Sequence, residues 1–112
     1  MTVFDFIVKE FPEFDAFTSS EPDWYRNEVN YGMAIRALDY AVDLKRRSKE
    51  AELERLFQHV EAGMRVEYVG DALCIDFIQR LSDLATAYEP DFVKLLGPLS
   101  KQCYEDGKVP LF

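Results

Sequence analysis

Residues 69–88 form the most apolar segment of the chain, and this segment most limits what the chain can fold into. Its apolar positions are Val69, Ala72, Leu73, Cys74, Ile75, Phe77, Ile78, Leu81, Leu84, Ala85 and Tyr88. On a helix they cover more than one face, and only Asp76, Gln79, Arg80 and Asp83 make a narrow polar strip. A helix that is apolar most of the way round is usually buried by its neighbours. We therefore predict a central helix over about 69–88, enclosed by other elements.

Two further segments show helical periodicity. In residues 31–47 the apolar positions Ile35, Leu38 and Val42 recur at helical spacing, and Asn30 stands where an N-cap is expected. The following helix begins near Ser48, a second candidate N-cap, and its apolar stripe consists of Leu53, Leu56, Phe57, Val60 and Met64. These patterns predict two amphipathic helices that pack against the central one.

The remaining segments are also typical of helices. Thr2 and Asp5 resemble a capping box, and Pro12 should end the helix that follows them. Shorter helices are expected at about 92–96 and 99–105, and no strand-like alternation is present. At 112 residues the chain has the size of one domain. The sequence predicts a single all-α domain, residues 1–112, of five to seven helices.

Net charge indicates the kind of partner, and cysteine content indicates the compartment. The formal net charge is −8, which disfavours direct nucleic-acid binding and favours a basic protein partner. No apolar run reaches the length of a membrane helix, no secretory signal is visible, and we expect a cytoplasmic protein. Cys74 and Cys103 are too few for a disulfide framework, so we interpret both as structural thiols in a reducing compartment.

Residues for catalysis are sparse. His59 is the one histidine, which excludes a two-histidine metal site within one chain, and it is interpreted as a boundary residue of its helix. The five glycines are isolated, so no phosphate-binding loop is present. The pair Glu10–Glu13, which could hold Mg²⁺, is interrupted by Pro12. We expect no enzyme activity, cofactor or metal.

Two groups of residues are candidates for a partner-binding site. Trp24 and Tyr25 are framed by acids in a polar connection, a composition typical of protein interfaces. In the alternative, Trp24 folds back and covers the core. Tyr40 and Asp43 lie one turn apart, opposite the apolar stripe of their helix. The full predicted set is Asp23, Trp24, Tyr25, Glu28, Asp39, Tyr40 and Asp43.

Four sequence stretches resemble a family of small all-helical bacterial proteins. They are Leu56-Phe57-Gln58-His59-Val60-Glu61, residues 72–81, the Leu95-Leu96-Gly97-Pro98 turn with the residues after it, and the opening Lys9-Glu10-Phe11-Pro12-Glu13. Some members of that family are similar to immunity proteins of contact-dependent growth inhibition and related polymorphic-toxin systems. The stretches span most of the chain but consist mainly of core positions, which carry fold more than function.

The resemblance implies inhibition by binding. The expected partner is a cognate toxin domain, held in a 1:1 complex. The toxin expected first is a ribonuclease with a basic active site. An acidic surface with exposed aromatic rings would cover such a site. Two other functions stay open: a regulatory or scaffold protein without a toxin, and a small Mg²⁺-dependent hydrolase. A homodimer is also compatible with the sequence.

Overall fold

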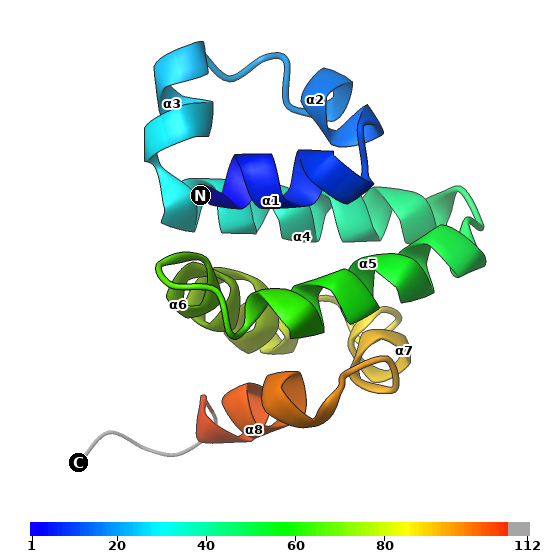
Figure 1. Ribbon diagram of the computed structural model, residues 1–112. Coiled ribbons are helices and arrows are strands. Elements are labelled where there is room, and N and C mark those ends of the chain that lie inside the picture. The colour runs from blue at the N-terminus through cyan, green and yellow to red at the C-terminus, as the bar shows by residue number, and fades with distance from the viewer. Residues whose placement is uncertain (108–112) are drawn as a thin grey trace.

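The computed structural model describes residues 1–107, and every regular element in that range is helical (Figure 1). In chain order the elements are α1 (Val3–Glu10), α2 (Glu13–Phe17), α3 (Asp23–Glu28), α4 (Asn30–Arg46), α5 (Glu50–Gly63), α6 (Val69–Leu73), η1 (Cys74–Ile78), η2 (Gln79–Asp83), α7 (Glu89–Val93) and α8 (Pro98–Asp106). The prediction of one all-α domain is confirmed. The radius of gyration of 13.1 Å is what a folded chain of this length should have.

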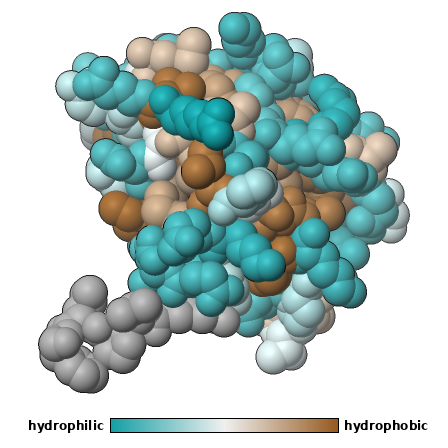
Figure 2. Space-filling model, turned by 60° about the horizontal axis from the view of Figure 1, so that its bottom comes forward, coloured by the Kyte–Doolittle hydropathy of each residue, from teal (hydrophilic) through white to brown (hydrophobic). Residues whose placement is uncertain are grey.

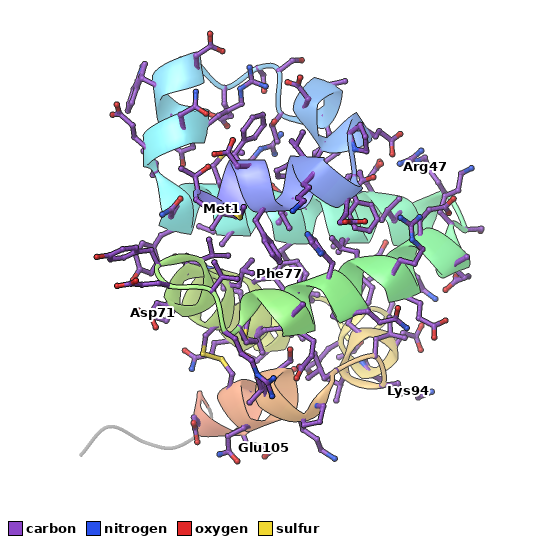
Figure 3. The ribbon with its side chains drawn as sticks, viewed as in Figure 1. Met1, Arg47, Asp71, Phe77, Lys94 and Glu105 are labelled. Carbon is purple, nitrogen blue, oxygen red and sulfur yellow. A yellow bond between two sulfur atoms is a disulfide. The ribbon has the colours of Figure 1, made fainter. Side chains whose placement is uncertain are left out.

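The helices stack around the long helix α4. In Figure 1, α1 crosses in front of α4, α2 and α3 lie above it, and α5, α6, α7 and α8 lie below. The segment α6–η1–η2 packs against α4, and η1 also contacts α8. Phe77 in η1 is completely buried and lies in the middle of the molecule in Figure 3. The apolar segment is therefore central at Val69, Ala72, Leu73, Phe77, Ile78 and Leu81, whereas Ile75 and Ala85 are exposed.

The central helix is shorter and less regular than predicted. It starts at Val69 but ends at Asp83, five residues before the expected end, because Leu84 has an extended backbone. Its middle turn, η1, is π-helical, and its last turn, η2, is a 3₁₀ helix. Pro90, two residues after the predicted end of this helix, lies in the first turn of α7, where a missing N–H costs nothing.

Of the three residues predicted as N-caps, only Thr2 caps its helix. Thr2 does cap α1, since its hydroxyl oxygen accepts a hydrogen bond of 3.1 Å from the Asp5 N–H. Asn30 does not cap α4; its side-chain oxygen accepts from the Val3 N–H at 3.0 Å and completes the start of α1. Ser48 does not cap α5 either, because it occupies the left-handed region with φ 58° in the turn between α4 and α5. The prediction that Pro12 ends the first helix is confirmed.

The interpretation of both cysteines as free thiols is wrong. Cys74 and Cys103 are joined in a disulfide between η1 and α8, with their Cα atoms 5.8 Å apart (Figure 3). The pairing depends on how α8 packs against η1, which the spacing of the two cysteines does not reveal.

Candidate partner-binding surface

Helix α4 presents one face to solvent along its whole length. Residues 31, 35, 39, 42 and 46 of this helix repeat every three to four positions and so share one face. The opposite face is buried, with Met33, Ala34, Ala37, Leu38, Tyr40, Ala41 and Leu44 all in the core. The outward face therefore consists of Tyr31, Ile35, Asp39, Val42 and Arg46, and we call it the α4 stripe.

The second half of the α4 stripe forms one wall of a groove of about 480 Å³. Its apolar lining consists of Phe17, Val42, Leu84, Ala85 and the ring of Tyr88, and its charged lining consists of Asp39, Asp43, Asp83 and Arg46. The lining holds three carboxylates and one guanidinium, and each carboxylate is also paired with an arginine beside the groove. The groove thus combines a charged rim with an apolar floor, and its carboxylates can accept a cation of another molecule.

The acids of the groove are paired only with neighbours on the surface. Asp39 accepts from Arg36 at 2.9 Å with half of its side chain exposed, and Asp43 accepts from Arg47 at 2.9 Å. The Asp83 carboxylate lies 3.9 Å from the Arg80 guanidinium and is 71% exposed. Ion pairs at such exposed positions contribute little to stability. A cation of a partner protein can therefore join or replace them at small cost to the fold.

Tyr40, in contrast, does not belong to this surface. Its ring is 2% exposed and packs against Phe11, Phe14 and Phe17. Its hydroxyl donates a 2.8 Å hydrogen bond to the Glu13 carboxylate, which also accepts from Arg47 at 3.0 Å. Burial, followed by the hydrogen bond to Glu13, raises the pKa of the Tyr40 phenol far above its usual 10. The prediction of Tyr40 as an interface residue is wrong, because the buried face of α4 is wider than its aliphatic stripe suggested.

The aromatic pair of the predicted site lies on α3, a helix that the sequence analysis read as a polar connection. Trp24 is 61% exposed, so the alternative in which it covers the core is excluded. Tyr25 is half-buried and packs on the start of α4, where a Cβ at Gly32 would collide with its hydroxyl. Glu28 is exposed, and Asp23 is paired with Arg26.

Arg26 fixes α3 to the rest of the domain. Its guanidinium pairs with Asp15 of α2 and with Asp23 at 2.8 Å, and it lies 4.8 Å from the centre of the Phe4 ring in α1. These contacts, together with the packing of α3 on α4, hold Trp24 outward on a rigid element. An exposed ring whose backbone is held in place loses little conformational entropy on binding.

The predicted residues therefore lie in two separate places on the molecule. Asp39 and Asp43 line the groove, while Trp24 and Glu28 are exposed on α3, which leads into α4 through Val29 alone. Sequence reasoning missed Val42, Leu84 and Tyr88 as the groove floor. Val42 was assigned to the buried face of its helix, and the turn after η2 was assigned to the central helix.

His59, the one histidine of the chain, lies against an aromatic ring. His59 stacks on the Phe6 ring with centroids 3.9 Å apart, and its Nε2 lies 2.6 Å from the Phe6 carbonyl oxygen. Within residues 1–107 no group of three His, Cys, Asp or Glu side chains could hold a metal ion. In the same range no helix is long and apolar enough to cross a membrane.

Fold and surface together define a small acidic all-helical domain with a groove beside α4. The chain belongs to the family described as a domain of unknown function, DUF7674, whose model matches residues 4–109. No curated protein and no solved structure matches the chain.

Proposed function

We propose that this protein is a bacterial immunity protein that binds and neutralises a cognate toxin domain in the cytoplasm. The observation that carries the proposal is the groove beside α4, with its three carboxylates and apolar floor on a chain of net charge −8. A nuclease toxin must hold phosphate groups, so its active site is basic. The acidic groove would cover that site and exclude the substrate by bulk and by charge.

A tight complex needs groups that the partner can bury. Neutralisation at nanomolar affinity needs about 12 kcal/mol of binding free energy. An interface of roughly 1,600 Å² supplies that when a few rings or cations are well buried in it. The groove beside α4 provides a pocket for a cation of the toxin, and Trp24, 61% exposed on α3, provides a ring that the toxin can bury.

The test begins with co-expression of this chain and the toxin domain encoded beside its gene. We expect a 1:1 complex that survives purification and a toxin that no longer kills. A toxin that kills equally with and without this protein would overturn the proposal. Catalytic turnover by the purified chain would overturn it as well.

The groove is then tested with a matched pair of charge reversals. Asp39→Lys changes the charge inside the groove, whereas Glu105→Lys makes the same change on an exposed residue of α8. We expect Asp39→Lys to raise the Kd at least ten-fold and Glu105→Lys to change it less than three-fold at 0.15 M salt. Equal effects of both variants would mean that net charge, and not the groove, carries the binding.

A further inference from the structure

The Cys74–Cys103 disulfide joins the centre of the fold to its last described helix. Cys74 is the first residue of the π-helical turn η1, and Cys103 lies in α8, 29 residues further along the chain. These two are all the cysteines that the chain contains. Reduction therefore gives one defined product, a dithiol, with no other pairing possible within the chain.

Helix α8 rests on the body of the domain through a small buried face. Only Ser100, Cys103 and Tyr104 of its nine residues are buried. Its first turn is held by Glu61, whose carboxylate oxygens accept hydrogen bonds from the Leu99 and Ser100 N–H groups, both 2.9 Å long. This attachment involves no sulfur, so it persists when the disulfide opens.

The second half of α8 depends on the disulfide more directly. Gln79 donates a 3.2 Å hydrogen bond to the Cys103 carbonyl oxygen, and Tyr104 donates a 2.7 Å hydrogen bond to Glu89. Lys101, Gln102 and residues 105–107 are exposed. Besides Cys103, Tyr104 is the one buried residue among residues 101–107, so local opening at this end of the helix after reduction exposes mainly that ring.

Small molecules can reach the disulfide from the surface. Cys74 is half-buried, and a hollow of about 270 Å³ is lined by both cysteines together with Gly70, Asp71, Gln102 and Asp106. The bond lies between α8 and the helices above it, near the edge of the molecule in Figure 3. Figure 2, which turns this lower side of the molecule forward, shows apolar groups among the hydrophilic ones there. A thiolate in the hollow could therefore attack a sulfur atom without unfolding the domain.

We propose that the Cys74–Cys103 disulfide is a reversible redox latch, opened by small thiols through this hollow, that controls whether the second half of α8 stays docked on η1. A thiolate attacks the Cys74 sulfur, forms a mixed disulfide with it and displaces the Cys103 thiolate, which takes up a proton. A second thiolate then attacks the sulfur of the small molecule in the mixed disulfide. Two thiols are thereby oxidised to one small disulfide, and the protein is left with two thiols.

The charge of the hollow gives the latch a preference among thiols. Asp71 and Asp106 both line it, so their carboxylates repel an anionic thiol and attract a cationic one. At low ionic strength we expect cysteamine to open the disulfide at least three-fold faster than mercaptoethanesulfonate. To correct for the intrinsic reactivity of each thiol, its rate with the protein is divided by its rate with hydroxyethyl disulfide, a small disulfide without charge.

In a reducing cytoplasm the latch would be mostly open. The groove beside α4 contains no residue of α8, so binding of a toxin there does not require the closed state. A result that overturns the latch therefore leaves the proposed function untouched, and a result that overturns the proposed function leaves the latch untouched.

Hydrogen exchange measured by mass spectrometry tests the latch on the full chain, with and without dithiothreitol. We expect no free thiols in the oxidised protein and two after reduction. Amides of residues 101–107 should then exchange at least ten-fold faster, while those of α4 exchange at an unchanged rate. Equal exchange of residues 101–107 in both states, or a failure of the thiols to pair under air, would overturn the proposal.

The double variant Cys74→Ser with Cys103→Ser is the matched control. It should be folded by circular dichroism, show the fast exchange of the reduced protein and be insensitive to dithiothreitol. Loss of structure in this variant, or faster exchange throughout the reduced wild type, would show that the disulfide stabilises the whole domain and not only the second half of α8. Either result would overturn the proposal. Equal normalised rates for the two charged thiols would refute entry through the acidic hollow.

Discussion

Replacement of Tyr40 by Phe isolates a single buried hydrogen bond. The change removes the hydroxyl that donates to Glu13 over 2.8 Å and leaves the ring among its aromatic neighbours. The substitution creates no large cavity, since only one oxygen atom is lost. The measured effect is therefore that of the bond between Tyr40 and Glu13.

The expected magnitude follows from the burial of the two partners. A hydrogen bond to a charged group contributes about 1.5–3 kcal/mol when both partners are buried. Here the tyrosine is buried, but the Glu13 side chain is 52% exposed, so its carboxylate is partly satisfied by water in either state. We expect Tyr40→Phe to lower the free energy of unfolding by about 1–1.5 kcal/mol, which corresponds to a fall of about 5 °C in Tm.

The destabilisation caused by Tyr40→Phe should become smaller at low pH. The hydrogen bond from Arg47, followed by that from Tyr40, lowers the pKa of Glu13 below its ordinary 4.5. A carboxyl group with a lowered pKa stabilises the fold fully above the unfolded value, and the contribution is lost as the pH falls through the folded value. The difference between wild type and Tyr40→Phe should therefore be constant from pH 7 to 5 and shrink below about pH 4.5.

Urea unfolding followed by circular dichroism, at pH 7 and at pH 3.5, measures both quantities. Glu13→Gln is the control, because it keeps an acceptor while removing the charge, and it should abolish most of the pH dependence. A stability of Tyr40→Phe equal to that of wild type at pH 7 would refute the reasoning. It would also return Tyr40 to the set of solvent-facing candidates for partner binding.

Four further substitutions test other features. Trp24→Ala should lower the free energy of unfolding by less than about 1 kcal/mol, because the ring is largely exposed, but weaken toxin binding ten-fold or more by titration calorimetry. Glu61→Gln should cost about 1 kcal/mol at pH 7 in urea unfolding and little below pH 4, because backbone hydrogen bonds from Ser100 and Leu99 outweigh burial and lower the pKa of Glu61. Ser48→Gly should raise stability by about 0.5–1 kcal/mol, since φ is 58° there, and a lower Tm would contradict this. Gly70→Ala should cost more than about 2 kcal/mol, because its Cβ would meet the rigid Met64 carbonyl, and an unchanged thermal melt would disprove that contact.

Helical periodicity predicted the fold class and the long helices well. Of the apolar positions predicted for α4, only Leu38 is buried, and Ile35 and Val42 lie on the outward face. The apolar stripe of α5, in contrast, matches its buried face, and Thr2 and Pro12 act within their own turn. Such features depend on neighbours in sequence, so sequence patterns reveal them. Asn30 looked like a local cap for the same reason, yet its side chain is used by α1, 27 positions away.

The candidate site was predictable only in part, because exposure is set by packing between helices. Asp39 and Asp43 were predicted as partner-binding residues, and the structure places both in the lining of the groove. Val42 was assigned to the core, but α4 turns its Tyr40 side inward and leaves Val42 on the groove floor. The disulfide likewise depends on the docking of α8 on η1. No local pattern in the sequence encodes either result.

The bond from the Val3 N–H to Asn30 makes the first helix incomplete without the fourth. Eight residues are too few for a helix that is stable alone in water. A peptide of residues 1–29 should therefore be unstructured, and α1 should melt together with α4 in one cooperative step. Helix α1 acquires its shape only after a segment made later has folded against it.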